Sequence, residues 1–280
     1  MKKITLAAIG LTMLASVSNA QLKVPQPSPT QTVTQAFGLG EIKIEYSRPA
    51  VKGRVTFGDL VPYDKIWRTG ANQATKITVG DDIKINGSAL AAGTYALYTM
   101  PNTAEWNVMF YKDLTLGGNV DDYKAENEVL RVKVKPAASM DKMENFTINV
   151  NNITATSCTI DLLWDKTRVS IPVTTEIDDK VMKTIEKEMG DKRPYHQAAT
   201  YYYDNNKDMA KALEWESKAA EANPKAYWIF HQKAKIQVKL KDYAGAMKSA
   251  QTSLALATED KDGSYIKMNE TLIADIKKMK

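Results

Sequence analysis

The chain has 280 residues, of which 44% are hydrophobic and 25% are charged. This ordinary globular composition excludes a collagen-like, low-complexity or wholly disordered protein, and the length allows one or two domains. The formal charge of +5 is small and its signs are mixed, so we expect no nucleic-acid partner. One cysteine excludes an intrachain disulfide, and two histidines argue against a histidine-rich metal centre. We therefore expect no metal and no cofactor.

Residues 1–20 have the pattern of a secretory signal peptide. Lys2 and Lys3 precede an apolar run over residues 4–17, and Ala20 supplies a small side chain at the cleavage position. The run is too short for a stable membrane span, and no cysteine follows it to carry a lipid anchor. We expect cleavage after Ala20, export to the periplasm or the extracellular space, and a soluble mature protein with no integral membrane span. The alternative is a buried N-terminal helix.

Residues 21–30 contain three prolines and are expected to form an extended lead-in. From residue 31 to residue 174, apolar and polar residues alternate in short stretches separated by turn signals such as Asn86-Gly87, with no helical run between them. About nine or ten such strands predict an antiparallel β sandwich or jelly-roll-like domain over residues 31–174. The alternating residues are Ile42, Ile44 and Tyr46; Ile77 and Val79; Ile83 and Ile85; Tyr95 and Leu97; Trp106, Val108 and Phe110; Leu130, Val132 and Val134; Phe146, Ile148 and Val150; Cys158, Ile160, Leu162 and Trp164; and Val169, Ile171 and Val173.

Beyond the strand region the apolar spacing changes to that of a helix. Ile177, Val181, Ile185 and Met189 recur every fourth residue and therefore share one helix face. This pattern predicts a linker helix over residues 175–192.

Residues 193–280 contain an internal repeat. The segment Lys207–Leu213, KDMAKAL, is matched 34 residues later by Lys241–Met247, KDYAGAM. This period is that of tetratricopeptide repeats, so the sequence predicts an all-α, tetratricopeptide-like helical repeat domain over residues 193–280. A generic helical hairpin bundle is the alternative, because His196, Thr200 and Glu216 occupy positions where the consensus has other residues.

Several uncommon residue blocks occur in order in the β half. They are Tyr46-Ser47-Arg48-Pro49, Lys52-Gly53-Arg54, Phe57-Gly58, Leu60-Val61-Pro62-Tyr63, Trp67-Arg68-Thr69-Gly70-Ala71-Asn72, Ala74-Thr75, Ala92-Gly93-Thr94-Tyr95, Glu105-Trp106 and Leu130-Arg131-Val132. Through these blocks the β half resembles an uncharacterised exported bacterial family, domain of unknown function 2911, over about residues 28–174. The resemblance implies an exported location and a separate β domain, sometimes followed by a helical repeat tail, but no established activity.

Little catalytic chemistry is available in the β half. Both histidines, His196 and His231, lie in the helical half, so the β half cannot form a Ser-His-Asp or Cys-His centre. We expect the two histidines to be surface or packing residues of the repeats. Cys158 shares a strand face with apolar residues and is expected to be a buried, unreactive thiol.

One segment of the β half, Tyr46–Lys76, is more basic than the rest. It carries a net charge of +4, and aromatic side chains are interleaved with its cations. Arginine suits carboxylate or phosphate groups, and flat aromatic rings suit sugars. One hypothesis is a pocket for a polar or anionic ligand; the alternative is that these arginines brace loops internally while Trp67 belongs to the core. The candidate ligand-binding residues are Arg48, Arg54, Trp67, Arg68 and Asn72.

These observations favour an exported, non-enzymatic binding or scaffold protein of the bacterial cell envelope. In this interpretation the β domain binds a glycan or a small anionic ligand, and the helical repeats dock an envelope protein or peptide on a concave surface. No catalytic residue is assigned. The alternative is a carbohydrate-active enzyme that uses a pair of carboxylates, since glycoside hydrolysis needs only two suitably spaced Asp or Glu side chains.

Overall fold

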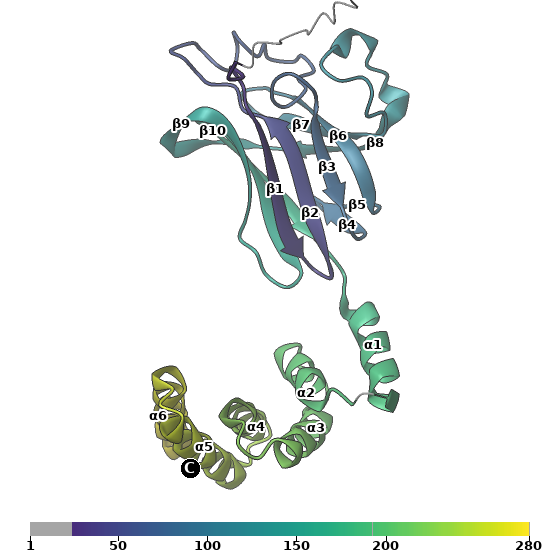
Figure 1. Cartoon of the computed structure of the whole chain (residues 1–280). Helices are drawn as coiled ribbons and strands as arrows, with labels where there is room; N and C mark the ends of the chain where they lie inside the picture. The colour runs from purple at the N-terminus through teal and green to yellow at the C-terminus, as the bar shows by residue number, and fades with distance from the viewer. Residues whose placement is uncertain (1–23, 192, 280) are drawn as a thin grey trace, which may run out of the picture. The chain divides into compact units, whose positions relative to one another are not determined.

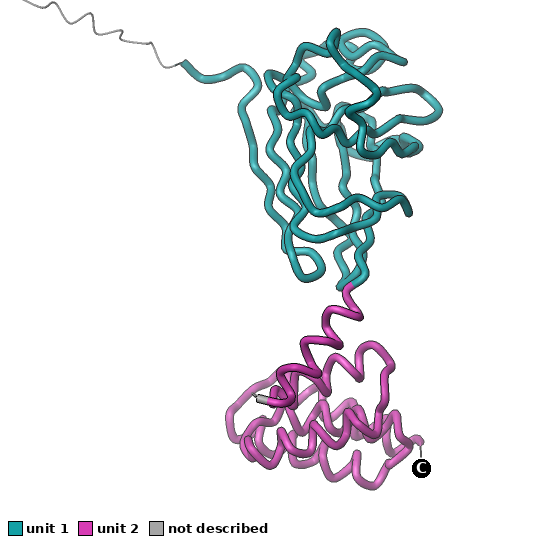
Figure 2. The backbone as a smooth tube through the Cα atoms, turned by 90° about the vertical axis from the view of Figure 1, so that its right-hand side faces the viewer, with its two compact units in different colours: residues 1–176 teal, residues 177–280 magenta. Residues whose placement is uncertain are grey.

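The computed structural model describes residues 24–191 and 193–279. The chain divides into two compact units between Glu176 and Ile177, which Figure 2 shows in different colours. The first unit is built of strands and the second of helices (Figure 1). This arrangement confirms the predicted fold class. The predicted signal peptide, residues 1–20, lies outside the described residues.

The first unit is a sandwich of two antiparallel sheets. One sheet has six strands in the order β1-β2-β3-β6-β7-β8, and the other has four in the order β5-β4-β10-β9. At the β4–β5 hairpin, Asn86 and Gly87 both have positive φ (46° and 83°), as a tight two-residue turn requires. The strands are β1 (Thr30–Phe37), β2 (Gly40–Ser47), β3 (Thr75–Val79), β4 (Ile83–Ile85), β5 (Ser88–Leu90), β6 (Gly93–Met100), β7 (Trp106–Tyr111), β8 (Glu128–Val134), β9 (Pro136–Asn151) and β10 (Ser157–Thr174).

The core between the sheets is formed by the side chains that the alternating pattern selects. In β2, for example, Ile42, Ile44 and Tyr46 are buried while the residues between them are exposed. Cys158 is also buried in this core, and burial raises the pKa of its thiol to about 11, so the thiol stays protonated and unreactive near neutral pH.

The six-stranded sheet has a second buried face. Ala96 and Tyr98 of β6, with Met109 and Tyr111 of β7, form a separate apolar cluster on which Tyr123 packs from the segment between β7 and β8. The rings of Tyr111 and Tyr123 are stacked with centroids 4.6 Å apart. Both faces of β6 and β7 are therefore buried, which an alternating pattern does not predict.

The described residues of the second unit form six helices, α1 to α6, and two of the helix starts lie 34 residues apart. Asp208 and Asp242 cap α3 and α5 by accepting hydrogen bonds from the backbone N–H groups of Lys211 and Gly245. The repeated Lys-Asp pair of the sequence therefore supplies the same N-cap in both repeats. The helices are α1 (Asp178–Asp191), α2 (Tyr195–Asp204), α3 (Met209–Ala222), α4 (Tyr227–Lys239), α5 (Tyr243–Glu259) and α6 (Gly263–Lys278).

Small side chains allow the paired helices to approach closely. Ala212 of α3, Ala234 of α4, and Ala246 and Ala250 of α5 are fully buried. No helix in the described part of the chain is both long enough and apolar enough to cross a membrane.

Candidate functional site

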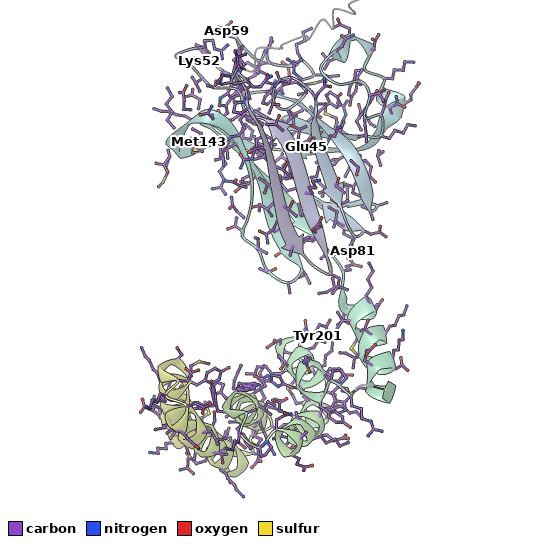
Figure 3. All side chains as sticks on the ribbon, viewed as in Figure 1. Glu45, Lys52, Asp59, Asp81, Met143 and Tyr201 are labelled. Atoms are coloured by element: carbon purple, nitrogen blue, oxygen red, sulfur yellow. The ribbon has the colours of Figure 1, made fainter. Side chains whose placement is uncertain are left out.

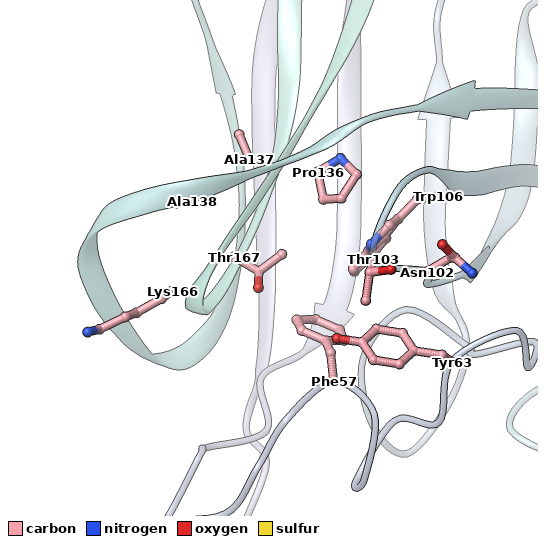
Figure 4. A pocket seen from close by; sticks show the side chains of 10 residues that line it. All are labelled: Phe57, Tyr63, Asn102, Thr103, Trp106, Pro136, Ala137, Ala138, Lys166 and Thr167. Atoms are coloured by element: carbon pink, nitrogen blue, oxygen red, sulfur yellow. The ribbon is translucent and has the colours of Figure 1, made fainter.

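A pocket in the β unit, which we call the aromatic pocket, is enclosed by segments far apart in the sequence (Figure 4). Its volume is about 320 Å³. One wall is the loop that follows β2, another is the β6–β7 connection, and the third is the ribbon of β9 and β10. The lining residues are Phe57, Tyr63, Asn102, Thr103, Trp106, Pro136, Ala137, Ala138, Lys166 and Thr167.

The first wall is a tight loop that presents two aromatic rings. The backbone N–H of Gly58 donates to the carbonyl of Val61 at 2.9 Å, and the N–H of Val61 donates to the carbonyl of Thr56 at 2.8 Å. Gly58 has a φ of 95°, and a Cβ there would lie 2.8 Å from the ring of Tyr63. Glycine is therefore required both for the backbone conformation and for the close packing of Tyr63. The loop holds Phe57 and Tyr63 near each other in the pocket (Figure 4).

Hydrogen bonds tie this loop to the second wall. The N–H of Asp64 donates to the carbonyl of Pro101 at 2.9 Å, and the side-chain amide of Asn102 donates to the carboxylate of Asp64 at 2.8 Å. The segment then enters β7 at Trp106, whose side chain is almost fully buried. Asn102 and Thr103 therefore bring polar groups beside the aromatic rings.

The third wall is a long ribbon with an irregularity at the pocket. The register between β9 and β10 shifts on both sides of Asp165, which has a positive φ of 51°. Such a bulge bends a ribbon and redirects its side chains. Beyond the bulge, Thr167 pairs with Ala138, and both line the pocket. Lys166, exposed at the bend, stretches outward from the rim (Figure 4).

The floor of the aromatic pocket continues into the core. The ring of Phe57 packs edge-on against Trp106 with centroids 4.9 Å apart, and against Trp67 and Trp164 at 5.9 and 5.8 Å. Trp67 and Trp164 stack on each other at 5.8 Å with an interplanar angle of 14°. The pocket therefore lies against a cluster of aromatic rings that pack on one another.

The residues that line the aromatic pocket can bind a ligand by ring stacking and by hydrogen bonding. The aromatic rings offer flat apolar surfaces, while Asn102, Thr103 and Thr167 offer polar groups. Lys166 is the one charged residue among the ten, and none of the ten has a carboxylate, an imidazole or a thiol. Elsewhere in the described part of the chain, no group of three or more His, Cys, Asp or Glu side chains is placed to hold a metal ion.

The predicted site residues lie outside the aromatic pocket, and their side chains bond to the protein itself. Arg48 donates to the carbonyl of Phe146 at 3.0 Å and to the hydroxyl of Thr147 at 2.7 Å. Arg54 donates to the carbonyls of Val51 and Ala50, at 3.0 and 2.7 Å. Both guanidinium groups thus brace the segment after β2.

The other three predicted residues make similar contacts. The indole of Trp67 donates to the carbonyl of Gly70 at 3.0 Å, and Arg68 donates to the carbonyl of Gly118 at 2.9 Å. The amide of Asn72 donates to the carbonyl of Ser28 and to the hydroxyl of Ser47, both at 3.1 Å.

The five residues share several neighbours in the structure. Arg48 and Trp67 both contact Phe146, and a Cβ at Gly118 would meet both Arg68 and the carbonyl of Asn72. No hydrogen bond joins any two of the five, all of which the structure describes. The exposed cations and acids of the same loop, such as Lys52 and Asp59, lie at one end of the β unit (Figure 3). A ligand on these arginines stays a prediction.

Most of the lining residues that the sequence analysis did not select fall into two groups. Phe57, Tyr63 and Trp106 lie within the blocks that carry the family resemblance, so a signal for them was present. Pro136, Lys166 and Thr167 belong to the strand ribbon, and no local sequence feature marks them. Their place in the pocket depends on the pairing of β9 with β10.

Both histidines have internal partners in the helical unit. The Nδ1 atom of His196 lies 2.9 Å from the carboxylate of Glu216, whose side chain is fully buried. Burial raises the pKa of Glu216, and the bond to His196 opposes this shift. The Nδ1 atom of His231 lies 2.8 Å from the amide oxygen of Asn269, and burial lowers the pKa of this imidazole.

Comparison with known proteins identifies the β unit. The model of the family described as "Protein of unknown function (DUF2911)" matches residues 28–173, which include every residue of the aromatic pocket. No curated protein and no solved structure matches the chain significantly.

Proposed function

The chain belongs to the DUF2911 family of proteins of unknown function, and from this premise we propose that it is an exported, non-enzymatic binding protein whose β unit takes up a glycan. The aromatic pocket is the proposed binding site. The helical repeats are proposed to dock an envelope protein or peptide.

The observation that carries the proposal is the pairing of exposed aromatic surface with polar groups in one pocket. Tyr63 is 38% exposed although its ring is wedged against Gly58, so the ring is held in place without being covered. A sugar ring has apolar C–H faces and an edge of hydroxyl groups. It would pack on Tyr63 and Phe57 and bond through its hydroxyls to Asn102 and Thr167.

Binding fits this pocket better than hydrolysis. Glycoside hydrolysis by the common mechanisms needs two carboxyl groups on either side of the scissile bond. None of the ten lining residues supplies one. The alternative of a carbohydrate-active enzyme would therefore need a site elsewhere on the chain, and sugar release catalysed by the purified protein would overturn our proposal.

We expect Tyr63→Ala to weaken glycan binding about tenfold or more, because loss of a well-placed aromatic anchor removes a large share of the contact energy. The measurement is titration calorimetry of the purified mature protein with neutral oligosaccharides of glucose, xylose and N-acetylglucosamine and with an oligogalacturonide.

Tyr63→Phe is the matched control. It keeps the ring and removes only the hydroxyl, so it is expected to retain most of the affinity. Melting temperatures of both variants separate a binding defect from unfolding. If no oligosaccharide binds the parent protein, or if Tyr63→Ala binds as well as Tyr63→Phe, the aromatic pocket is not a glycan site.

Export is proposed from the pattern of residues 1–20, and we expect the mature protein to begin at Gln21. N-terminal sequencing of the protein recovered from the periplasm or the medium of an expressing bacterium measures this directly. Replacing apolar residues in the 4–17 run by charged ones should trap the precursor in the cytosol. Recovery of the parent chain with Met1 retained would contradict export by this signal.

A further inference from the structure

The helical unit contains a groove of about 640 Å³ formed by α2, α4 and α6. These are the first helix of each repeat pair and the closing helix, which together line the inner surface of a stacked repeat. Every residue that lines this groove belongs to the second unit, so the groove is complete within it. The lining residues are Tyr203, His231, Lys235, Ser264, Lys267, Met268, Thr271, Leu272 and Asp275.

The groove has more free positive charge than negative charge. Among the described residues no carboxylate pairs with the ammonium groups of Lys235 and Lys267, whereas the one lining carboxylate, Asp275, is paired with Lys278 at 3.1 Å. Lys239 does not line the groove; its ammonium lies 5.3 Å from the ring centre of Tyr203 and donates to the amide oxygen of Asn206 at 2.7 Å. His231 adds no charge near neutral pH, because burial lowers its pKa. The excess charge therefore belongs to lysines.

Apolar surface lies beside these cations. Met268 is 45% exposed, and Leu272 lies one helical turn further along α6. The ammonium of Lys235 lies 4.6 Å from the ring centre of Tyr203, within the range of a cation–π contact, so this lysine is positioned over the groove. An occupant that matches both features needs carboxylates for the lysines and an apolar side chain for the methionine and leucine.

We propose that the α2–α4–α6 groove binds an acidic peptide segment of a partner protein, with carboxylates at Lys235 and Lys267 and an apolar side chain against Met268 and Leu272. This inference rests on the proposed docking function of the repeats and names the chemistry of its partner. Charge complementarity selects the occupant, since two unpaired lysines disfavour a basic segment.

Selection from a random peptide display library against the full mature protein tests the proposal. Selected peptides are expected to be enriched in Asp and Glu. They should bind at least about tenfold more weakly to the variant Lys235→Glu/Lys267→Glu, because charge-assisted hydrogen bonds are replaced by repulsion. Their affinity should also fall as the salt concentration rises.

The matched control is Lys248→Glu/Lys277→Glu. It changes the net charge equally at two exposed lysines that do not line the groove, and it is expected to bind the peptides like the parent. Melting temperatures check that both variants are folded. If both variants weaken peptide binding equally, the loss of affinity reflects only the change in net charge, and the groove is not the binding site.

Two further results separate this inference from the docking function itself. The first result would be selected peptides that are not enriched in Asp and Glu but lose affinity for the variant Met268→Arg. It would overturn the proposal of an acidic partner and leave the docking function intact. Failure to select any peptide that depends on the groove would contradict both. Glycan binding by the β unit is measured separately and is expected to be unchanged in all of these variants.

Discussion

Trp164→Ala is expected to lower the free energy of unfolding of the β unit by about 3–5 kcal/mol, the range for removing a large aromatic side chain from a packed core. Trp164 is 2% exposed and contacts Trp67, Phe57 and Phe146. The substitution leaves a cavity that rigid neighbouring rings cannot fill. Because Phe57 also lines the aromatic pocket, glycan affinity should fall together with stability.

Scanning calorimetry of the full mature chain measures this effect as a lower melting temperature of the β unit. Trp228→Ala is the matched control, because Trp228 is 43% exposed on α4 and its removal should leave the melting temperature of the β unit unchanged. Equal effects of the two substitutions would contradict the central place of Trp164 in the core.

His196→Leu is expected to destabilise the helical unit by about 3 kcal/mol at neutral pH, because it leaves the buried carboxylate of Glu216 without its partner. One oxygen of Glu216 is already buried without a hydrogen bond, so the carboxylate has no second hydrogen bond to replace that of the imidazole. Urea denaturation followed by circular dichroism of the helices gives the change in free energy.

The pH dependence of the variant provides a second readout. The pKa of Glu216 is raised by burial in the folded state, so the protonated form is favoured there. The stability that protonated Glu216 contributes is fully present below the pKa of glutamate in the unfolded state, about 4.3. It is lost as the pH rises through the higher pKa of Glu216 in the folded state. The loss caused by His196→Leu should therefore be small in acid and grow toward neutral pH. The double variant His196→Leu/Glu216→Leu removes the charge and should regain most of the stability; no recovery would contradict the buried pair.

The pairing of His196 with Glu216 shows which features the sequence predicts and which depend on the tertiary structure. Both residues depart from the tetratricopeptide consensus, so the sequence marks their positions as unusual. The sequence did not predict that they contact each other, because they lie 20 residues apart on α2 and α3. The helix pair brings them together, and burial then requires each polar group to find a partner.

The sequence by itself predicted the fold class, a β domain followed by an α-helical domain. Period-two alternation marked strands such as Ile42–Tyr46, because one face of a sheet packs on the core while the other meets solvent. The 34-residue period and the repeated Lys-Asp caps marked the paired helices. The alternation and the caps are local features, and the period is found by comparing two segments 34 residues apart in the sequence; none of the three requires knowledge of how the elements pack.

Only the tertiary structure decided what covers the second face of β6 and β7 and where the pocket lies. Tyr98 and Tyr111 are buried under Tyr123, a contact that depends on how the β7–β8 connection folds back. The aromatic pocket joins Phe57, Trp106 and Thr167, which are distant in sequence and meet only because of strand order and a bulge at Asp165. The arginines that the sequence offers as candidate ligand-binding groups donate to backbone carbonyls of the protein, and only the fold shows which carbonyls these are. The physical reason is that a loop's carbonyl groups must find hydrogen-bond donors once the chain is folded, and sequence spacing does not reveal which side chains will be near enough to supply them.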